Sequence, residues 1–204
     1  MHDPRPTFDA ALRTATEVID GVRADQLHLP TPCDDMDVEA MLLHVVSVVD
    51  RVAVTGQGGN PFAVDVRPSL DGAWADAVAR YRSVWADDAA LAVTSPLPWA
   101  PGDGRDVLRM YVFELTTHTW DLATATGQTP AWDDTAVTAA ADWAVANMGT
   151  TPEERAAKFE PIYDALPPAV RDLPPPFGDP LPVADAAPAI DKVVAWSGRV
   201  ASAG

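Results

Sequence analysis

The chain has 204 residues and a formal net charge of −16, from 14 basic and 30 acidic side chains. Surfaces that bind nucleic acid or an anionic membrane need an excess of Lys and Arg, so both are excluded as partners. The sequence shows no apolar run long enough to span a membrane and no signal peptide, and its single cysteine, Cys33, suits a reducing compartment, so we expect a cytoplasmic protein.

Helical periodicity dominates the first two thirds of the chain. From Thr7 to Val22, apolar residues recur at steps of three and four, which is the pattern of one helix face. The connector 29–33 should be extended, because each of its prolines fixes φ and disfavours a helical conformation in the residue before it. Asp37 is suited to cap a second helix, whose apolar stripe runs from Val38 to Val52.

Two further helices are expected before residue 128. The third extends from Leu70 to Leu91, and a segment rich in proline and glycine ends it. The fourth extends from Arg105 to Thr126, with Gly127 at the position where helices commonly end in a left-handed residue. Four helices joined by short or Pro/Gly-rich links predict a four-helix bundle whose core covers about residues 7 to 127.

The last third of the chain has a different character. A fifth helix is expected from Asp134 to Met148, and ten of the twenty prolines follow it. The segment from Pro152 to Pro182 is therefore predicted to be an irregular strap with at most short helices, before a last helix from Ala187 to Val200. Because the strand signal is weak throughout, the sequence predicts one all-α domain over 1–204, with 128–204 as a C-terminal extension.

Two of the four histidines, His44 and His118, fall inside predicted helices. His44 borders the apolar stripe of the second helix, and taken alone it is most simply a hydrogen-bonded core histidine. Glu114 and His118 are four residues apart, so they share one helix face with the apolar residues of the fourth helix. A carboxylate on such a face is unusual and needs a compensating partner.

Two kinds of partner would compensate Glu114. One is a hydrogen bond to His118 or to an arginine, with Arg51 and Arg109 as candidates. The other is a divalent metal, because two imidazoles and one carboxylate suit zinc and its neighbours, and three ligands leave a coordination position open. In that case His44 would complete the set from a facing helix. The spacing does not choose between the two interpretations.

Three further residues each have two possible roles, and a fourth has one. Asp121 could accept the second N–H of a ligand imidazole, or it could pair with an arginine at the bundle surface. Tyr111 could line the cavity above a metal as a proton donor or as a wall. Trp120 is expected to pack. Cys33 precedes a helix N-terminus that would stabilise a thiolate, but a small buried connector residue is the simpler interpretation.

Several stretches of the sequence together form a family pattern that covers nearly the whole chain. They are Thr31-Pro32-Cys33 with Val38, Leu43-His44-Val45, the run from Phe113 to Gln128 that contains Glu114, His118 and Asp121, Phe177-Gly178-Asp179-Pro180 with Ala187-Pro188, and Trp196-x-Gly198-Arg199. This pattern resembles the DinB-like superfamily, in the branch of the mycothiol-dependent maleylpyruvate isomerases and their uncharacterised metal-binding relatives.

The resemblance implies a four-helix bundle that holds a divalent metal through ligands on its second and fourth helices, which match His44, Glu114 and His118. Zinc is the first expectation, with nickel, manganese or iron as alternatives. Characterised members use a low-molecular-weight thiol, such as mycothiol or bacillithiol, which the metal activates as a thiolate. The chain departs from the pattern at Met36, where relatives carry Trp. It also looks too short and too proline-rich for the C-terminal α/β domain of the isomerases, which argues against maleylpyruvate as substrate.

The sequence therefore predicts a metal-dependent thiol transferase or isomerase that acts on a small electrophilic substrate. Its partners would be a small-molecule thiol and that substrate, and the resemblance also allows a homodimer. One alternative is a non-catalytic metal-binding bundle with a structural, sensing or stress role. A second alternative has no metal and places Glu114 in a core hydrogen bond.

Overall fold

The computed structural model describes residues 3–33, 36–166 and 177–200. In these ranges the regular structure is helical, with two isolated β-bridges and no strand. The predicted all-α class is therefore confirmed. No helix in the described part of the chain is both long enough and apolar enough to cross a membrane.

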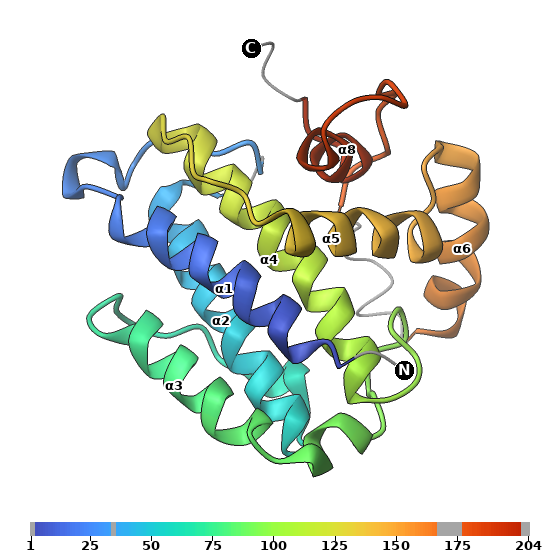
Figure 1. The fold of residues 1–204 in the computed structure, drawn as a ribbon, viewed down its shortest axis with the longest axis horizontal. Helices are drawn as coiled ribbons and strands as arrows, with labels where there is room; N and C mark the ends of the chain where they lie inside the picture. Colours follow the sequence, from blue (N-terminus) through green and yellow to red (C-terminus); the bar gives the residue numbers. More distant parts are fainter. Residues whose placement is uncertain (1–2, 34–35, 167–176, 201–204) are drawn as a thin grey trace.

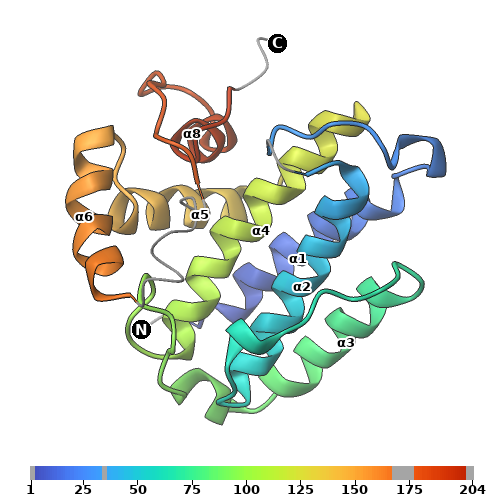
Figure 2. The same ribbon diagram turned by 180° about the vertical axis from the view of Figure 1, so that it is seen from behind.

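Four long helices enclose the main core: α1 (Arg5–Asp20), α2 (Val38–Gly56), α3 (Ala73–Trp85) and α4 (Gly104–Thr126) (Figure 1). Helix α4 packs on both α1 and α2, and α2 packs on α3, so that α2 lies between α3 and α4 when the molecule is seen from behind (Figure 2). This arrangement places one long face of α4 against α2. The DinB-like form of the bundle stays a prediction.

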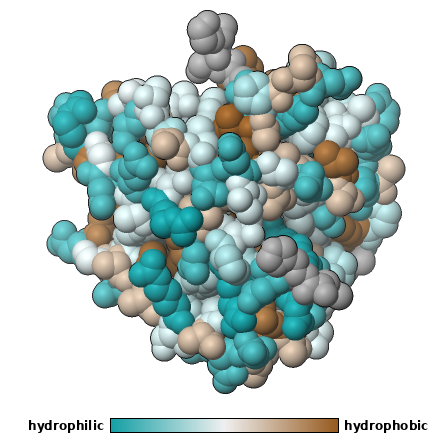
Figure 3. Space-filling view, in the orientation of Figure 1, coloured by the Kyte–Doolittle hydropathy of each residue, from teal (hydrophilic) through white to brown (hydrophobic). Residues whose placement is uncertain are grey.

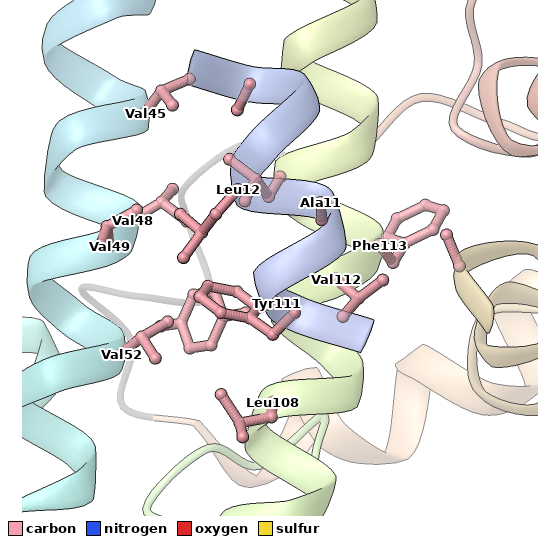
Figure 4. Close-up of a cluster of buried hydrophobic side chains, with 14 of the residues drawn as sticks. Ala11, Leu12, Val45, Val48, Val49, Val52, Leu108, Tyr111, Val112 and Phe113 are labelled. Carbon is pink, nitrogen blue, oxygen red and sulfur yellow. The ribbon is translucent and has the colours of Figure 1, made fainter. Parts of the chain in front are cut away.

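Apolar side chains from three of these helices fill the space between them (Figure 4). Those that are at most 2% exposed include Leu12 from α1, Val48 and Val52 from α2, and Leu108, Tyr111 and Val112 from α4. Burying one such side chain stabilises the fold by about 1.5–3 kcal/mol. By contrast, the face of the molecule seen in Figure 3 carries hydrophilic residues spread among small hydrophobic patches.

Local sequence determines where the two site-bearing helices begin and end. The Asp37 carboxylate accepts a hydrogen bond from the backbone N–H of Ala40 at 2.9 Å, which confirms the predicted cap of α2. Asp103 caps α4 in the same way, through the backbone N–H of Arg105 at 2.9 Å. Gly127 ends α4 with a φ of 69°, a left-handed conformation that favours glycine.

The prediction for the third helix was too long. Helix α3 ends at Trp85, and the chain continues as a 3-10 helix, η3 (Asp88–Ala92), where a helix to Leu91 was expected. The Asp87 side chain accepts a hydrogen bond from the backbone N–H of Ala89 at 2.9 Å. Asp87 therefore caps the start of η3, and α3 does not continue through it. Two more 3-10 helices, η1 (Ala24–Gln26) and η2 (Pro61–Ala63), lie in other connections.

The predicted irregular strap from Pro152 onward was wrong in its first half, which is the helix α6 (Pro152–Ala165). Its N-cap Thr151 accepts a hydrogen bond from the backbone N–H of Glu154 at 3.2 Å. Proline at the first helical position loses no hydrogen bond, because that N–H has no partner within the helix. Of the remaining strap, 167–176 lies outside the described residues, and 177–182 is irregular, as expected.

Two further helices cover the side of α4 that faces away from α2 and α3. Helix α5 (Asp134–Asn147) packs on α4, and α8 (Ala189–Trp196) packs on α5 and also contacts α4 (Figure 1). Helix α8 is shorter than the predicted helix from Ala187 to Val200, because the chain turns at Gly198 with a φ of 84°. The segment after α8 thereby returns toward α4.

Candidate metal centre

The three side chains predicted to bind a metal meet between α2 and α4. His44 Nε2 lies 3.6 Å from Glu114 Oε1, and the rings of His44 and His118 meet edge to face with their centroids 4.6 Å apart. One potential ligand atom from each of the three residues lies within 4.8 Å of the other two. The structure thus brings His44 to Glu114 and His118, which are far from it in the sequence.

The His44 imidazole shows that the group fits a cation. Its Nε2 atom is buried without a hydrogen-bond partner, because the 3.6 Å separation from Glu114 is too long for a hydrogen bond. Leaving such an atom unsatisfied costs about 1–3 kcal/mol. Two ligand atoms on one tetrahedral zinc ion lie about 3.4 Å apart. A shared divalent cation would therefore satisfy both atoms with little movement of either side chain.

The composition of the group also fits a divalent ion. Two imidazoles and one carboxylate are a donor set for zinc and its first-row neighbours. Among the described residues, the group consists of His44, Glu114 and His118. Structural zinc sites commonly use four protein ligands, whereas three leave a position for water or another small molecule. The arrangement can therefore hold an ion and expose it to a ligand.

The charges of the site favour an ionised Glu114 and a neutral His118. Burial alone would raise the pKa of the Glu114 carboxyl, but the neighbouring His44, His118 and Arg51 lower it below its usual value. For His118 the main influence is burial, which lowers the pKa of the imidazole, although Asp121 acts in the opposite direction. An ionised carboxylate and a neutral imidazole are the forms in which these two side chain types bind a metal.

Asp121 contacts both His118 and an arginine, but the arginine pair is buried, where the sequence suggested one at the bundle surface. Its Oδ2 atom lies 3.0 Å from His118 Nδ1, and its two oxygens accept hydrogen bonds from Arg199 Nη2 and Nε, each at 2.8 Å. Burial would raise the pKa of Asp121, but His118 and Arg199 lower it. An ionised carboxylate can only accept hydrogen bonds, so Nδ1 of His118 carries the proton and the lone pair of Nε2 is free for a metal.

The C-terminal segment covers His118. The Phe177 ring stacks on the His118 ring at a centroid distance of 6.2 Å and meets the Phe113 ring edge to face at 5.1 Å. The Arg199 guanidinium lies 5.8 Å from the centroid of the same Phe177 ring, a cation–π arrangement. His118 is consequently only 4% exposed, and residues near the end of the chain form part of its surroundings.

Tyr111 and the two arginines proposed as partners of Glu114 differ in their surroundings. Tyr111 is 2% exposed and belongs to the apolar core, where burial and the charge of Glu114 raise the pKa of its hydroxyl. This placement favours a wall over a proton donor. Arg109 pairs with Asp106 at 2.8 Å, whereas Arg51 acts on Glu114 through its charge.

Trp120 is placed as expected, whereas Cys33 is more exposed than expected. Trp120 is 9% exposed, in agreement with a packing role. Cys33 is only half-buried, which differs from the expected buried connector residue, and its side chain interacts with the Arg199 guanidinium. Burial would lower the pKa of Arg199, but Asp121 and, to a smaller extent, Cys33 raise it, so the guanidinium stays charged.

Sequence reasoning did not assign a role to Arg199 or Phe177. Both belong to the stretches that carry the family resemblance, but neither has a spacing that points to the metal ligands. One signal was available. A buried Asp121 requires a positive partner, and the sequence supplies few arginines outside the predicted bundle.

Comparisons with known proteins give relatives but no activity. No family model and no solved structure matches the chain. Two similar proteins are "Uncharacterized protein MT0763" of Mycobacterium tuberculosis strain CDC 1551 and "Uncharacterized protein Rv0738" of strain H37Rv. Each is 27% identical over 198 residues, which cover 97% of this chain and 98% of the relative. The similarity therefore extends over almost all of both chains.

Proposed function

We propose that the chain is a divalent-metal-binding protein of the DinB-like type, which acts as a thiol-dependent transferase or isomerase on a small electrophilic substrate. The observation that carries the proposal is the meeting of His44, Glu114 and His118 between two helices, with a buried imidazole nitrogen that has no hydrogen-bond partner. The all-helical fold and the packing of α2 on α4 support it.

Each residue of the site has a distinct part in this function. His44, Glu114 and His118 would hold the ion, and Asp121 would orient His118 by accepting a hydrogen bond from its Nδ1–H group. A divalent ion in this position would supply Lewis acidity, which lowers the pKa of a thiol that binds to it. The three-ligand group leaves room for that thiol. Mycothiol or a related low-molecular-weight thiol is the proposed cosubstrate, and zinc is the first choice of metal.

A second function is favoured by the burial of His118. Its ring is 4% exposed and is covered by Phe177, as in a site that retains its ion for stability. In this case the protein is a non-catalytic metal-binding bundle. The two functions share the ion and differ in whether a thiol reaches it.

Metal analysis of untagged protein, purified without added metal, tests the shared part of both functions. We expect about one divalent ion per wild-type chain and a negligible amount in His44→Ala. Equal, negligible metal in both proteins would overturn the proposal. Turnover of electrophiles with mycothiol, bacillithiol or glutathione then separates the two functions. Activity that is lost in Glu114→Gln supports the transferase or isomerase, and no activity with any thiol in the metal-loaded protein supports the non-catalytic bundle.

A further inference from the structure

Arg199 makes contacts that differ from those of an ordinary structural arginine. Both of its hydrogen bonds to Asp121 are 2.8 Å long and involve separate carboxylate oxygens, while its Nη1 donates to the backbone carbonyl of Ser197 at 2.9 Å. Arg199 is 6% exposed and Asp121 is 0% exposed. The pair is therefore sealed from solvent, where the two-pronged geometry of arginine matters most.

The partner of Arg199 is itself a partner of His118. Asp121 Oδ2 lies 3.0 Å from His118 Nδ1 and also accepts a hydrogen bond from Arg199. With the guanidinium in place, the carboxylate cannot rotate away from the imidazole without losing two charge-assisted hydrogen bonds. Stacking of Phe177 on the His118 ring restricts the same imidazole from a second direction.

Arg155 provides a comparison within the same chain. It also holds the C-terminal segment, because its Nη1 donates a hydrogen bond to the carbonyl of Gly178 at 2.9 Å and its Nη2 donates one to the carbonyl of Trp196. Its Nε donates a third hydrogen bond, to the carbonyl of Met148 at 2.8 Å. Its hydrogen bonds end at backbone carbonyls. Arg155 thus anchors the segment through its backbone, whereas Arg199 binds the side chain of Asp121, which contacts His118.

We propose that Arg199 is a positioning residue for the metal ligand His118 and acts on it through Asp121. Residues 177–200 thereby set the affinity and geometry of a site whose ligands all lie on α2 and α4. The inference rests on the metal site of the proposed function. Outer partners of a ligand imidazole commonly contribute 10- to 100-fold to metal affinity because they determine which ring nitrogen carries the proton and where the ring points.

Cobalt titration of the untagged full-length protein tests the inference, with Co²⁺ alone as the probe and its visible absorption as the signal. We expect Arg199→Gln to raise the Co²⁺ dissociation constant by at least about tenfold and to change the absorption spectrum. Arg199→Lys should lie between wild type and Arg199→Gln, because lysine keeps the charge but cannot bind both oxygens. Arg155→Gln should lower thermal stability and leave both the spectrum and the affinity of the folded protein unchanged.

Each outcome of the titration decides a different question. Wild type that binds Co²⁺ with Arg199→Gln unchanged overturns the positioning role and leaves the proposed function intact. An equal loss of Co²⁺ affinity in Arg199→Gln and Arg155→Gln also overturns the positioning role, because the docking of residues 177–200 as a whole would then explain the effect. Wild type that binds no Co²⁺ overturns the proposed function and the positioning role together. If Arg199→Gln does not fold, Arg199→Lys decides in its place by the same comparison.

Discussion

The rings of His44 and His118 meet edge to face across α2 and α4, with their centroids 4.6 Å apart and their planes at 84°. Two imidazoles in this arrangement do not hydrogen-bond to each other, and one of them, His44, also has an unsatisfied buried nitrogen. An apolar pair would pack in this space without that penalty. An ion bound by both rings, as proposed above, would remove that penalty.

Loss of one ligand should remove the ion's effect on stability. A ligand that binds only the folded state raises the melting temperature, so zinc should stabilise the wild type and have little effect on His44→Ala. The loss of affinity should exceed the roughly 10- to 100-fold that follows loss of an outer partner. Thermal melts with and without zinc measure the stabilisation by the ion and its loss in the variant. His28→Ala is the control, since His28 is 87% exposed, and a similar loss in this variant would contradict the assignment.

Removing Asp121 should destabilise the fold even without metal. Asp121→Asn would leave the buried Arg199 without an ionic partner, and breaking a buried ion pair from one side costs about 3–5 kcal/mol. Urea denaturation of the metal-free protein measures this change. Asp25→Asn is the matched control, because Asp25 pairs with Arg23 at the surface, where such pairs contribute about 0–1 kcal/mol. Equal losses in the two variants would show that the Asp121–Arg199 pair is not energetically special.

Phe177 should control how fast the ion leaves. Its ring covers His118 and separates part of the site from solvent. Phe177→Ala should therefore release bound metal several-fold faster when the protein is challenged with an excess of chelator. Phe62→Ala serves as the control, because Phe62 is 60% exposed. Identical release rates for the two variants and the wild type would show that the ring is not a barrier.

The pH dependence of stability should carry a contribution from Asp9 on α1. One carboxylate oxygen of Asp9 is buried without a hydrogen-bond partner, and burial raises its pKa more than the charges of Arg82 and Arg13 lower it. A raised pKa in the folded state means that the protonated form is favoured there. The stability contributed by this proton is complete below the unfolded pKa and is lost as pH rises through the folded pKa.

The melting temperature of Asp9→Asn should therefore increase relative to that of the wild type as the pH rises from acid to neutral. The gain arises because asparagine carries no buried charge at either pH. Melting temperatures of both proteins across this range measure the difference. Asp142→Asn, at an exposed position in the middle of α5, is the control for removal of one negative charge. If the melting temperatures of Asp9→Asn and Asp142→Asn, each relative to the wild type, change with pH in the same way, the burial of Asp9 does not cause the change.

Local patterns were sufficient to predict the helices that carry the site. Helix α4 begins and ends within one residue of its predicted bounds, because an aspartate caps its start and Gly127 ends it. Helix α6 was missed because the proline content of its segment outweighed the capping signal at Thr151. A proline at the first position is compatible with a helix. The position of the proline relative to Thr151 indicates this, whereas the number of prolines in the segment does not.

The candidate site could be predicted only in part. The spacing of Glu114 and His118 places them on one helix face, and the apolar stripe of α2 directs His44 toward them. The contact of Arg199 with Asp121 joins residues 78 positions apart. No periodicity links such residues, since their meeting depends on how α8 packs on α4 and α5. The candidate ligands can be predicted from local helix geometry, whereas the contacts of Asp121 and Arg199 that position His118 depend on tertiary packing.

The distance along the chain between Asp121 and Arg199 has a consequence for synthesis. Ribosomes add roughly 5–20 residues per second, so about 4–16 s pass between the two positions. During that interval all three candidate ligands are already part of the chain, while the guanidinium that holds Asp121 does not yet exist. If the proposed ion binds before Arg199 is added, it binds at a looser site than the one in the finished protein.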